Sequence, residues 1–101
     1  VAQNIRTARW AKANPAEATR YIARDSGSAE ELVPFKYSPN VVNALEPSLD
    51  ENLIGYLEDQ KNFLVREGFL RNDFAIADFV AHGPVRAARA LVDLEERSVA
   101  A

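Results

Sequence analysis

The sequence predicts an all-α fold, a small irregular bundle of about five helices. Helix start and stop signals recur along the chain: proline or a capping residue opens most apolar-periodic segments, and glycine or proline closes several of them. No segment alternates apolar and polar residues over more than a few positions, as a half-buried strand would. The 101 residues suit a single helical segment, 1–101, with a thin core. The predicted helices cover about 1–13, 15–25, 29–33, 39–46, 49–67 and 84–97.

The first two predicted helices are separated by a restart signal. Residues 1–13 carry small and apolar side chains at helical spacing. Asn14 is predicted to cap the second helix and Pro15 to occupy its first position. Gly27 is predicted to end that helix in the left-handed conformation.

Prolines divide the next part of the chain. Pro34 is predicted to end the short helix 29–33, because proline disfavours helix in the residue before it. An extended or irregular segment follows, and then the short helix 39–46. Two aromatics and a cation on such a segment are candidates for lining a ligand cleft, and the alternative is a small core beneath a loop. These weak ligand-binding candidates are Phe35, Lys36 and Tyr37.

The longest predicted helix is 49–67. Ser48 is predicted to cap it, with Glu51 completing a capping box. Gly68 is predicted to end it in a Schellman motif, with Phe69 touching the last turn. Its core-facing stripe is predicted to consist of Leu53, Ile54, Leu57, Lys61 and Leu64, widened by Leu49, Tyr56, Phe63 and Val65.

The rest of the chain predicts a connector and a final helix. Residues 70–81 are expected to have short-range order at most, with their apolar side chains as anchors. These anchors are Phe74, Ile76 and Phe79. Gly83 and Pro84 then open the last helix, 84–97.

The residue types present predict no catalytic residue, no metal ligand and no cofactor. The chain has no cysteine, which excludes disulfides, thiolate nucleophiles and cysteine zinc sites. The one histidine, His82, lies in the turn before the last helix, and the serines are explained as caps, turn residues or tail. The acidic clusters lack the ligand order of a calcium loop.

The charge pattern predicts no nucleic-acid partner, and the hydropathy pattern predicts no membrane span. The net charge is -3, and the basic residues are scattered among acids. The best basic stripe is interpreted as a solvated face, and it comprises Arg6, Arg9, Arg20 and Arg24. No apolar run approaches the ~20 residues that span a bilayer. No signal peptide is recognisable, and the absence of methionine together with a start inside a helical pattern indicates part of a larger protein.

The order of these elements resembles a known family. "ARWAKANPAEATRYIARDSG" is similar to a W-A-x-x-(H/N)-P-x-E-A stretch, with one residue fewer before the proline. "LDENLIGYLEDQKNFLVREGFL" is similar to a long helix ending in G-(L/F)-(I/L), and a D-F-V-(D/A) element follows it. Together, over about residues 1–84, they resemble the C-terminal part of periplasmic-type solute-binding proteins of the nitrate, sulfonate and taurine ABC importer family. The tail "GPVRAARALVDLEERSVAA" is longer than that family leads us to expect. The matching residues are Trp10, Ala11, Asn14, Pro15, Glu17, Ala18, Asp78, Phe79, Val80 and Ala81.

This resemblance implies a fold, a function and a location. The whole protein would have two α/β lobes around a ligand cleft, and this chain would be its C-terminal helical segment. The implied function is capture of a small organic anion, such as a sulfonate, taurine or nitrate, by hinge closure. The implied partners are an ABC permease and the missing α/β lobes, and the implied location is periplasmic or otherwise extracytoplasmic.

Two alternatives stay open. Enzymes of the aryl-sulfinate desulfinase and thiamine-pyrimidine synthase types have the same fold, and "VVNALEPSLDENLIGYLEDQKNFL" is at least as similar to the desulfinase branch. Such an enzyme would take its nucleophile from outside this chain, and the sequence favours a non-enzyme. The other alternative is a free-standing helical interaction module, which would expose an apolar patch to a partner helix.

Overall fold

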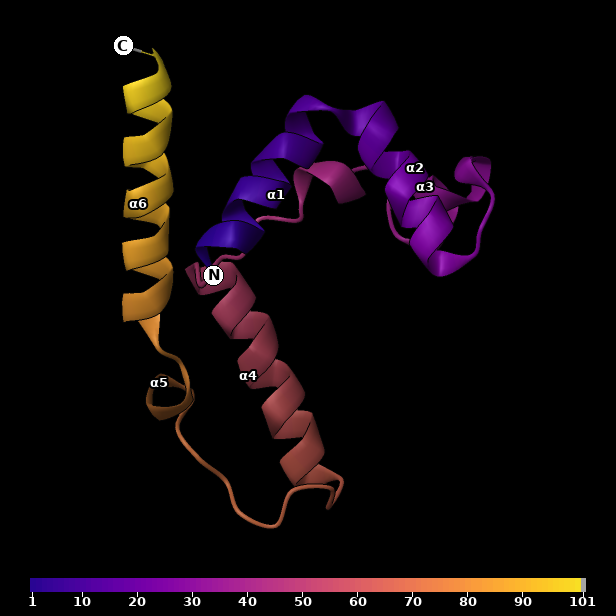
Figure 1. Cartoon of the computed structure of the whole chain (residues 1–101). Coiled ribbons are helices and arrows are strands. Elements are labelled where there is room, and N and C mark those ends of the chain that lie inside the picture. Colours follow the sequence, from indigo (N-terminus) through magenta and orange to yellow (C-terminus); the bar gives the residue numbers. More distant parts are fainter. Residues whose placement is uncertain (101) are drawn as a thin grey trace. The chain divides into compact units, whose positions relative to one another are not determined.

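The computed structural model describes residues 1–100, without the side chain of Ala100, and this part of the chain is helical (Figure 1). Residues 1–100 contain no strand, which confirms the predicted all-α class. The chain divides into two compact units. The first consists of Val1–Pro47 and the chain from Ala88 on, and the second is Ser48–Ala87.

The first unit contains two helices of three turns, several short elements and most of the last helix. Both long N-terminal helices begin and end within a residue of their predicted bounds. The elements are α1 (Ala2–Ala13), α2 (Pro15–Ser26), the 3₁₀ turn η1 (Glu30–Leu32), α3 (Val33–Lys36), the 3₁₀ turn η2 (Val41–Asn43) and α6 (His82–Ala100) from Ala88 on.

The junction between α1 and α2 differs from its prediction in one respect. Asn14 makes no side-chain cap bond to α2. Its Nδ2 instead donates to the Trp10 carbonyl at 2.9 Å, so the side chain closes α1 rather than opening α2. Pro15 does begin α2, and Gly27 ends it with φ 67°, as predicted.

The prediction that Pro34 ends a helix and leaves an irregular segment is wrong. Val33–Lys36 form the one-turn helix α3, with Pro34 in its first turn, where a missing N–H leaves no carbonyl unsatisfied. Val33 is helical although it precedes a proline, and it is 1% exposed. We infer that burial of this side chain outweighs the local preference for extended backbone.

The predicted helix 39–46 is also wrong, because only the single turn η2 forms there. Asparagine and valine dominate this stretch, and both are poor helix formers. One buried side chain, Val42, anchors it. A segment this short cannot offset the cost of helix nucleation without more packing than that.

The core of the first unit consists of small clusters. In one, Ile5 of α1 packs with Val92 and Ala88 of α6. In the other, Ala11 and Ala18 pack with Val42. Alanine removes little apolar surface from water, so the few larger side chains carry most of the stabilisation.

The second unit contains α4 (Glu51–Arg66), α5 (Ile76–Phe79) and the start of α6. The long helix lies within the predicted range 49–67. The α5 turn lies inside the predicted connector 70–81, where Ile76 is buried at 6% exposure. A single helical turn with Ile76 buried agrees with the short-range order and the anchor expected in this connector. By contrast, Phe79 is 65% exposed and Phe74 38%.

The start of α4 corrects the predicted cap. Asp50, not Ser48, is the N-cap residue, and its Oδ1 accepts the Leu53 N–H at 3.2 Å. Ser48 supports this cap, because its Oγ accepts the Asp50 N–H and donates to Oδ2, both at 3.2 Å. A carboxylate at this position also interacts favourably with the positive end of the helix dipole.

The predicted stripe of α4 is only partly buried. Lys61 is the one fully buried member, at 8% exposure. Ile54, Leu57 and Leu64 are half-buried. The predicted burial is wrong for three residues that are exposed: Leu53 at 46%, Tyr56 at 69% and Phe63 at 47%. Few elements of the second unit are available to cover this face of the helix.

The end of α4 has the predicted Schellman geometry. Gly68 has φ 81°, its N–H donates to the Val65 carbonyl, and the Phe69 N–H donates to the Leu64 carbonyl. Phe69 itself remains 73% exposed, so hydrogen bonds rather than an apolar contact fix this ending.

Two glycine substitutions in α4 and its end are expected to have opposite effects. An added Cβ meets nothing within 4 Å at Gly68 or Gly55, so backbone conformation decides both cases. Gly68→Ala should lower the free energy of unfolding by about 1 kcal/mol, because φ is positive. Gly55→Ala should raise it by about 0.5–1 kcal/mol, because the residue is helical. Urea denaturation followed by circular dichroism measures both. If the two substitutions changed the free energy of unfolding in the same direction, the assigned helix end would be contradicted.

None of the helices over residues 1–100 combines the length and the apolar character needed to cross a membrane.

Candidate functional site

The aromatic candidates lie on α3 and its end, in the first unit. Phe35 is 87% exposed, and Tyr37 is 47% exposed. Lys36 Nζ donates to Ser28 Oγ at 3.1 Å and lies 5.8 Å from the centroid of the Tyr37 ring. The structure therefore keeps Lys36 and Tyr37 together and directs Phe35 to solvent. Such a residue is available as an anchor for another protein surface.

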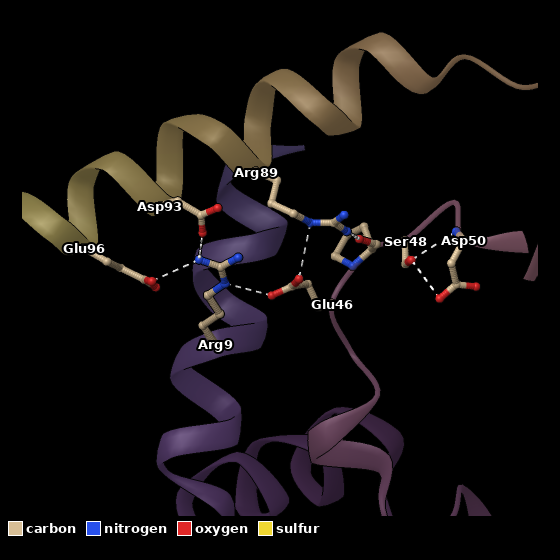
Figure 2. A network of polar contacts seen from close by, with 8 residues as sticks. Arg9, Glu46, Ser48, Asp50, Arg89, Asp93 and Glu96 are labelled. Carbon is tan, nitrogen blue, oxygen red and sulfur yellow. Dashed lines mark hydrogen bonds and ion pairs between the residues drawn. The ribbon is translucent and has the colours of Figure 1, made fainter.

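A charge network centred on Arg9 is the most connected polar feature of the first unit (Figure 2). Arg9 Nε donates to Glu46 at 2.8 Å. Its Nη1 donates to Asp93 at 2.7 Å and to Glu96 at 3.0 Å. Arg89 approaches the same Glu46 at 3.6 Å and donates to the Pro47 carbonyl at 3.0 Å. The network links α1, the segment after η2 and α6.

The electrostatics of this network indicate a structural role. The hydrogen bonds that Arg9 donates to Glu46 first, and then to Asp93, raise the pKa of Arg9, which therefore stays charged. Arg6 pairs in the same way with Glu95 of α6, at 2.7 Å, and this pair lowers the pKa of Glu95. Two members of the predicted basic stripe, Arg6 and Arg9, are thus each paired with carboxylates of other segments. Guanidinium groups that are already paired offer little to an incoming anion.

Sequence reasoning missed the acidic partners of this network. Glu46 lies 37 residues from Arg9, and Asp93 lies 84 residues from it. Helical spacing pairs only residues three or four positions apart. No signal in the chain therefore indicates these contacts.

A second polar contact lies in the second unit, beside an apolar groove. Lys61 Nζ donates to Asp73 Oδ1 at 2.7 Å, and the Phe74 N–H donates to the same oxygen at 2.8 Å. The groove has a volume of about 240 Å³. It is lined by Leu57, Gln60, Lys61, Leu64, Leu70, Phe74, Ile76 and Phe79. The ion pair holds the connector 70–75 beside α4 at the edge of this groove.

The Lys61–Asp73 pair is expected to make stability depend on pH. The bond from Lys61 first, and then that from Phe74, lowers the pKa of Asp73 from its ordinary value of 3.8. A lowered pKa stabilises the fold above that ordinary value, and the contribution is lost as pH falls through the folded value. At about pH 6 the wild-type chain should therefore unfold at a higher urea concentration than Asp73→Asn. This difference between the two unfolding midpoints should vanish near pH ~2. A pH-independent difference would show that the carboxylate charge is not involved.

His82 lies at the start of α6 and lines another groove of the second unit, about 390 Å³ in volume, which Ile54 and Glu58 also line. Over residues 1–100 the structure brings together no group of three or more histidine or acidic side chains that could hold a metal ion. The prediction that His82 belongs to a turn is corrected, since it is the first residue of α6.

Comparison with known proteins adds no relative: no protein-family model, curated protein or solved structure matches the chain. The structure offers paired charges inside the first unit, exposed aromatic side chains, and an apolar groove lined by one buried lysine. Such features suit packing and binding better than they suit proton transfer or nucleophilic attack.

Proposed function

We propose that this chain is a helical packing element of a larger solute-binding protein, whose apolar side chains are covered by the α/β lobes of that protein. The observation that carries the proposal is where the apolar side chains lie: mostly small ones are buried, and many large ones are exposed. The buried core is built mainly from alanine and valine, with two isoleucines. Large apolar side chains, which proteins usually bury, are more than one third exposed. They include Trp10, Leu32, Phe35, Leu53, Tyr56, Phe63, Leu91 and Leu94.

The exposed side chains occur in both units, so each unit has surface to bury. In the first, Phe35 and Leu32 belong to consecutive elements, α3 and η1. In the second, Tyr56 and Phe63 lie two turns apart on α4. Burying a side chain of this size stabilises a protein by about 1.5–3 kcal/mol. Covering several of them would therefore add substantially to the stability of the whole protein.

The resemblance supplies the specific form of the proposal. The ordered elements from Trp10 to Ala81 resemble the C-terminal part of solute-binding proteins of the nitrate, sulfonate and taurine ABC importer family. On this proposal the lobes capture a small organic anion outside the cytoplasm and deliver it to a permease. This chain supports a lobe and supplies no residue to the captured anion. The paired state of Arg6 and Arg9 agrees with that division of roles.

A second candidate is a free-standing interaction module, and the exposure of Phe35 favours it. A one-turn helix that presents an aromatic ring at 87% exposure suits insertion into a pocket of a partner protein. This candidate predicts that the chain melts cooperatively alone and gains stability only with that partner.

The reading frame that encodes this chain tests the leading proposal. We expect it to encode two α/β lobes before Val1. The encoded protein should bind taurine, an alkyl sulfonate or nitrate in calorimetry. A frame that encodes helical residues alone would overturn the proposal and favour the module. Turnover of an aryl sulfinate by the encoded protein would instead make it an enzyme of the same fold.

A surface substitution provides a test of the packing role itself. Tyr56→Asp should change the stability of this chain alone by less than about 0.5 kcal/mol, because the residue is 69% exposed. In the whole encoded protein it should cost about 2 kcal/mol or more, because a charge would enter a covered face. Asn62→Asp, at another exposed position of α4, is the matched control and should have a small effect in both. Equal small effects of Tyr56→Asp in the two proteins would show that this face stays uncovered.

A further inference from the structure

We propose that the groove beside Lys61 binds a small, neutral aromatic molecule that carries one hydrogen-bond acceptor, such as a benzamide or a phenol. The groove lies entirely within the second unit, between α4, the connector and α5. This inference does not depend on the proposed function, because that function assigns no ligand to this chain.

The walls of the groove are apolar and come from three successive elements. Helix α4 contributes Leu57 and Leu64, and the connector contributes Leu70 and Phe74. Ile76 and Phe79 of α5 complete the wall. The Phe74 and Phe79 rings are 5.5 Å apart and tilted by 45°. Rings at this spacing present both a face and an edge to a third ring, which suits an aromatic occupant.

The size of the groove selects a single ring. A closed apolar cavity of about 150 Å³ lined by similar side chains stays dry and holds benzene. The groove here has about 240 Å³ and opens to solvent. It therefore has room for one ring with a small substituent, and its opening lets the ligand enter without movement of the helices.

The polar edge of the groove specifies the substituent. Lys61 is 8% exposed, and Asp73 accepts one of the three N–H donors of its ammonium group. The Phe74 ring centroid lies 5.7 Å from the same nitrogen. The remaining donors can serve a ligand oxygen at the rim, and Gln60 belongs to the same lining. A carbonyl or phenol oxygen on the ring matches this edge.

The net charge of the edge decides between neutral and anionic ligands. The Asp73 carboxylate balances the Lys61 ammonium at 2.7 Å, so the edge is neutral overall. Asp73 is itself 63% exposed and bonds the Lys61 nitrogen, so an anion that bound this nitrogen would also approach the Asp73 carboxylate. Like charges this close repel each other, so a carboxylate or sulfonate loses what it gains from Lys61. A neutral acceptor avoids that repulsion.

Amide chemical shifts of the full chain, titrated with benzamide, test the proposal. We expect saturable shifts confined to residues 57–64 and 70–79, with a Kd of about 1 mM. Sodium benzoate has the same ring and an anionic oxygen pair, and it should bind at least tenfold more weakly. Toluene lacks the acceptor and should fall between the two.

Two variants locate the bound ring. Leu70→Trp should fill the groove and abolish the benzamide shifts, whereas Phe69→Trp, at the adjacent exposed position outside the lining, should leave them unchanged. Lys61→Met keeps the apolar stem and removes the donor, so it should erase the preference for benzamide over toluene.

Several results would overturn the proposal. Benzoate binding as tightly as benzamide would show that the edge is not neutral. Benzamide shifts that survive Leu70→Trp would place the ligand elsewhere. Groove shifts that appear on raising the protein concentration alone would show that a second copy of the chain occupies the groove.

Discussion

Replacing Ile5 by alanine is expected to lower the free energy of unfolding by about 2–4 kcal/mol. Ile5 is 0% exposed and packs with Val92 and Ala88 of α6. Its removal leaves a cavity among small side chains that cannot move in to fill it. Since a domain of this size has a total stability of only about 5–10 kcal/mol, this one change should remove a large part of it. Urea denaturation followed at 222 nm measures the loss.

A control for Ile5→Ala exists in the same unit. Val99→Ala removes apolar atoms from α6 at a position that is 89% exposed, and it should change stability by less than about 0.5 kcal/mol. If the free energy of unfolding fell by the same small amount in both variants, Ile5 would not be a core residue of the folded chain. If Ile5→Ala were unfolded outright, Ile5→Val should show the graded loss of about 1 kcal/mol expected for one methyl group.

Replacing Arg9 by alanine is the second change with a large expected effect, a loss of about 1–3 kcal/mol. Arg9 is one quarter exposed and bonds three carboxylates, from the segment after η2 and from α6. Its removal leaves Glu46, Asp93 and Glu96 facing each other with Arg89 as the nearest remaining cation, and like charges repel. The loss should shrink as salt is added, because salt screens that repulsion.

Arg9→Lys and Arg20→Ala complete the test. Lysine restores the charge but not the two separate guanidinium edges, so Arg9→Lys should recover only part of the lost stability. Arg20, an exposed member of the predicted basic stripe, should be replaceable by alanine at little cost. An Arg9→Ala variant as stable as wild type at low salt would mean that the network contributes specificity of packing and no net stability.

The fold class and the three longest early helices were predictable because their signals are local. Proline at the first position of α2 and left-handed glycines at 27 and 68 act through one turn of backbone. One error lies where burial decides the outcome. Val33 is helical before a proline and is buried.

The candidate site was predictable to a smaller extent. The sequence indicated Phe35 as a candidate because it is an aromatic residue on an expected irregular segment between prolines. The structure places it in the short helix α3, where it is exposed. Lys61 belongs to the predicted stripe of α4, and it is the buried residue of that helix. Its partner Asp73, twelve residues on across an irregular connector, has no sequence signal. The groove depends on that connector, so the sequence pattern did not indicate it.

The division of the chain has a consequence for the order of events during synthesis. Ser48–Ala87 is one continuous stretch, whereas the first unit combines the opening residues with those from Ala88 on. Ile5 therefore leaves the ribosome long before Val92, the side chain that covers it. The central stretch can fold while Ile5 of α1 still lacks its partner on α6, and closing so long a loop slows the final step. During that interval the chain would need protection from aggregation at its earliest helix, α1, rather than at its latest.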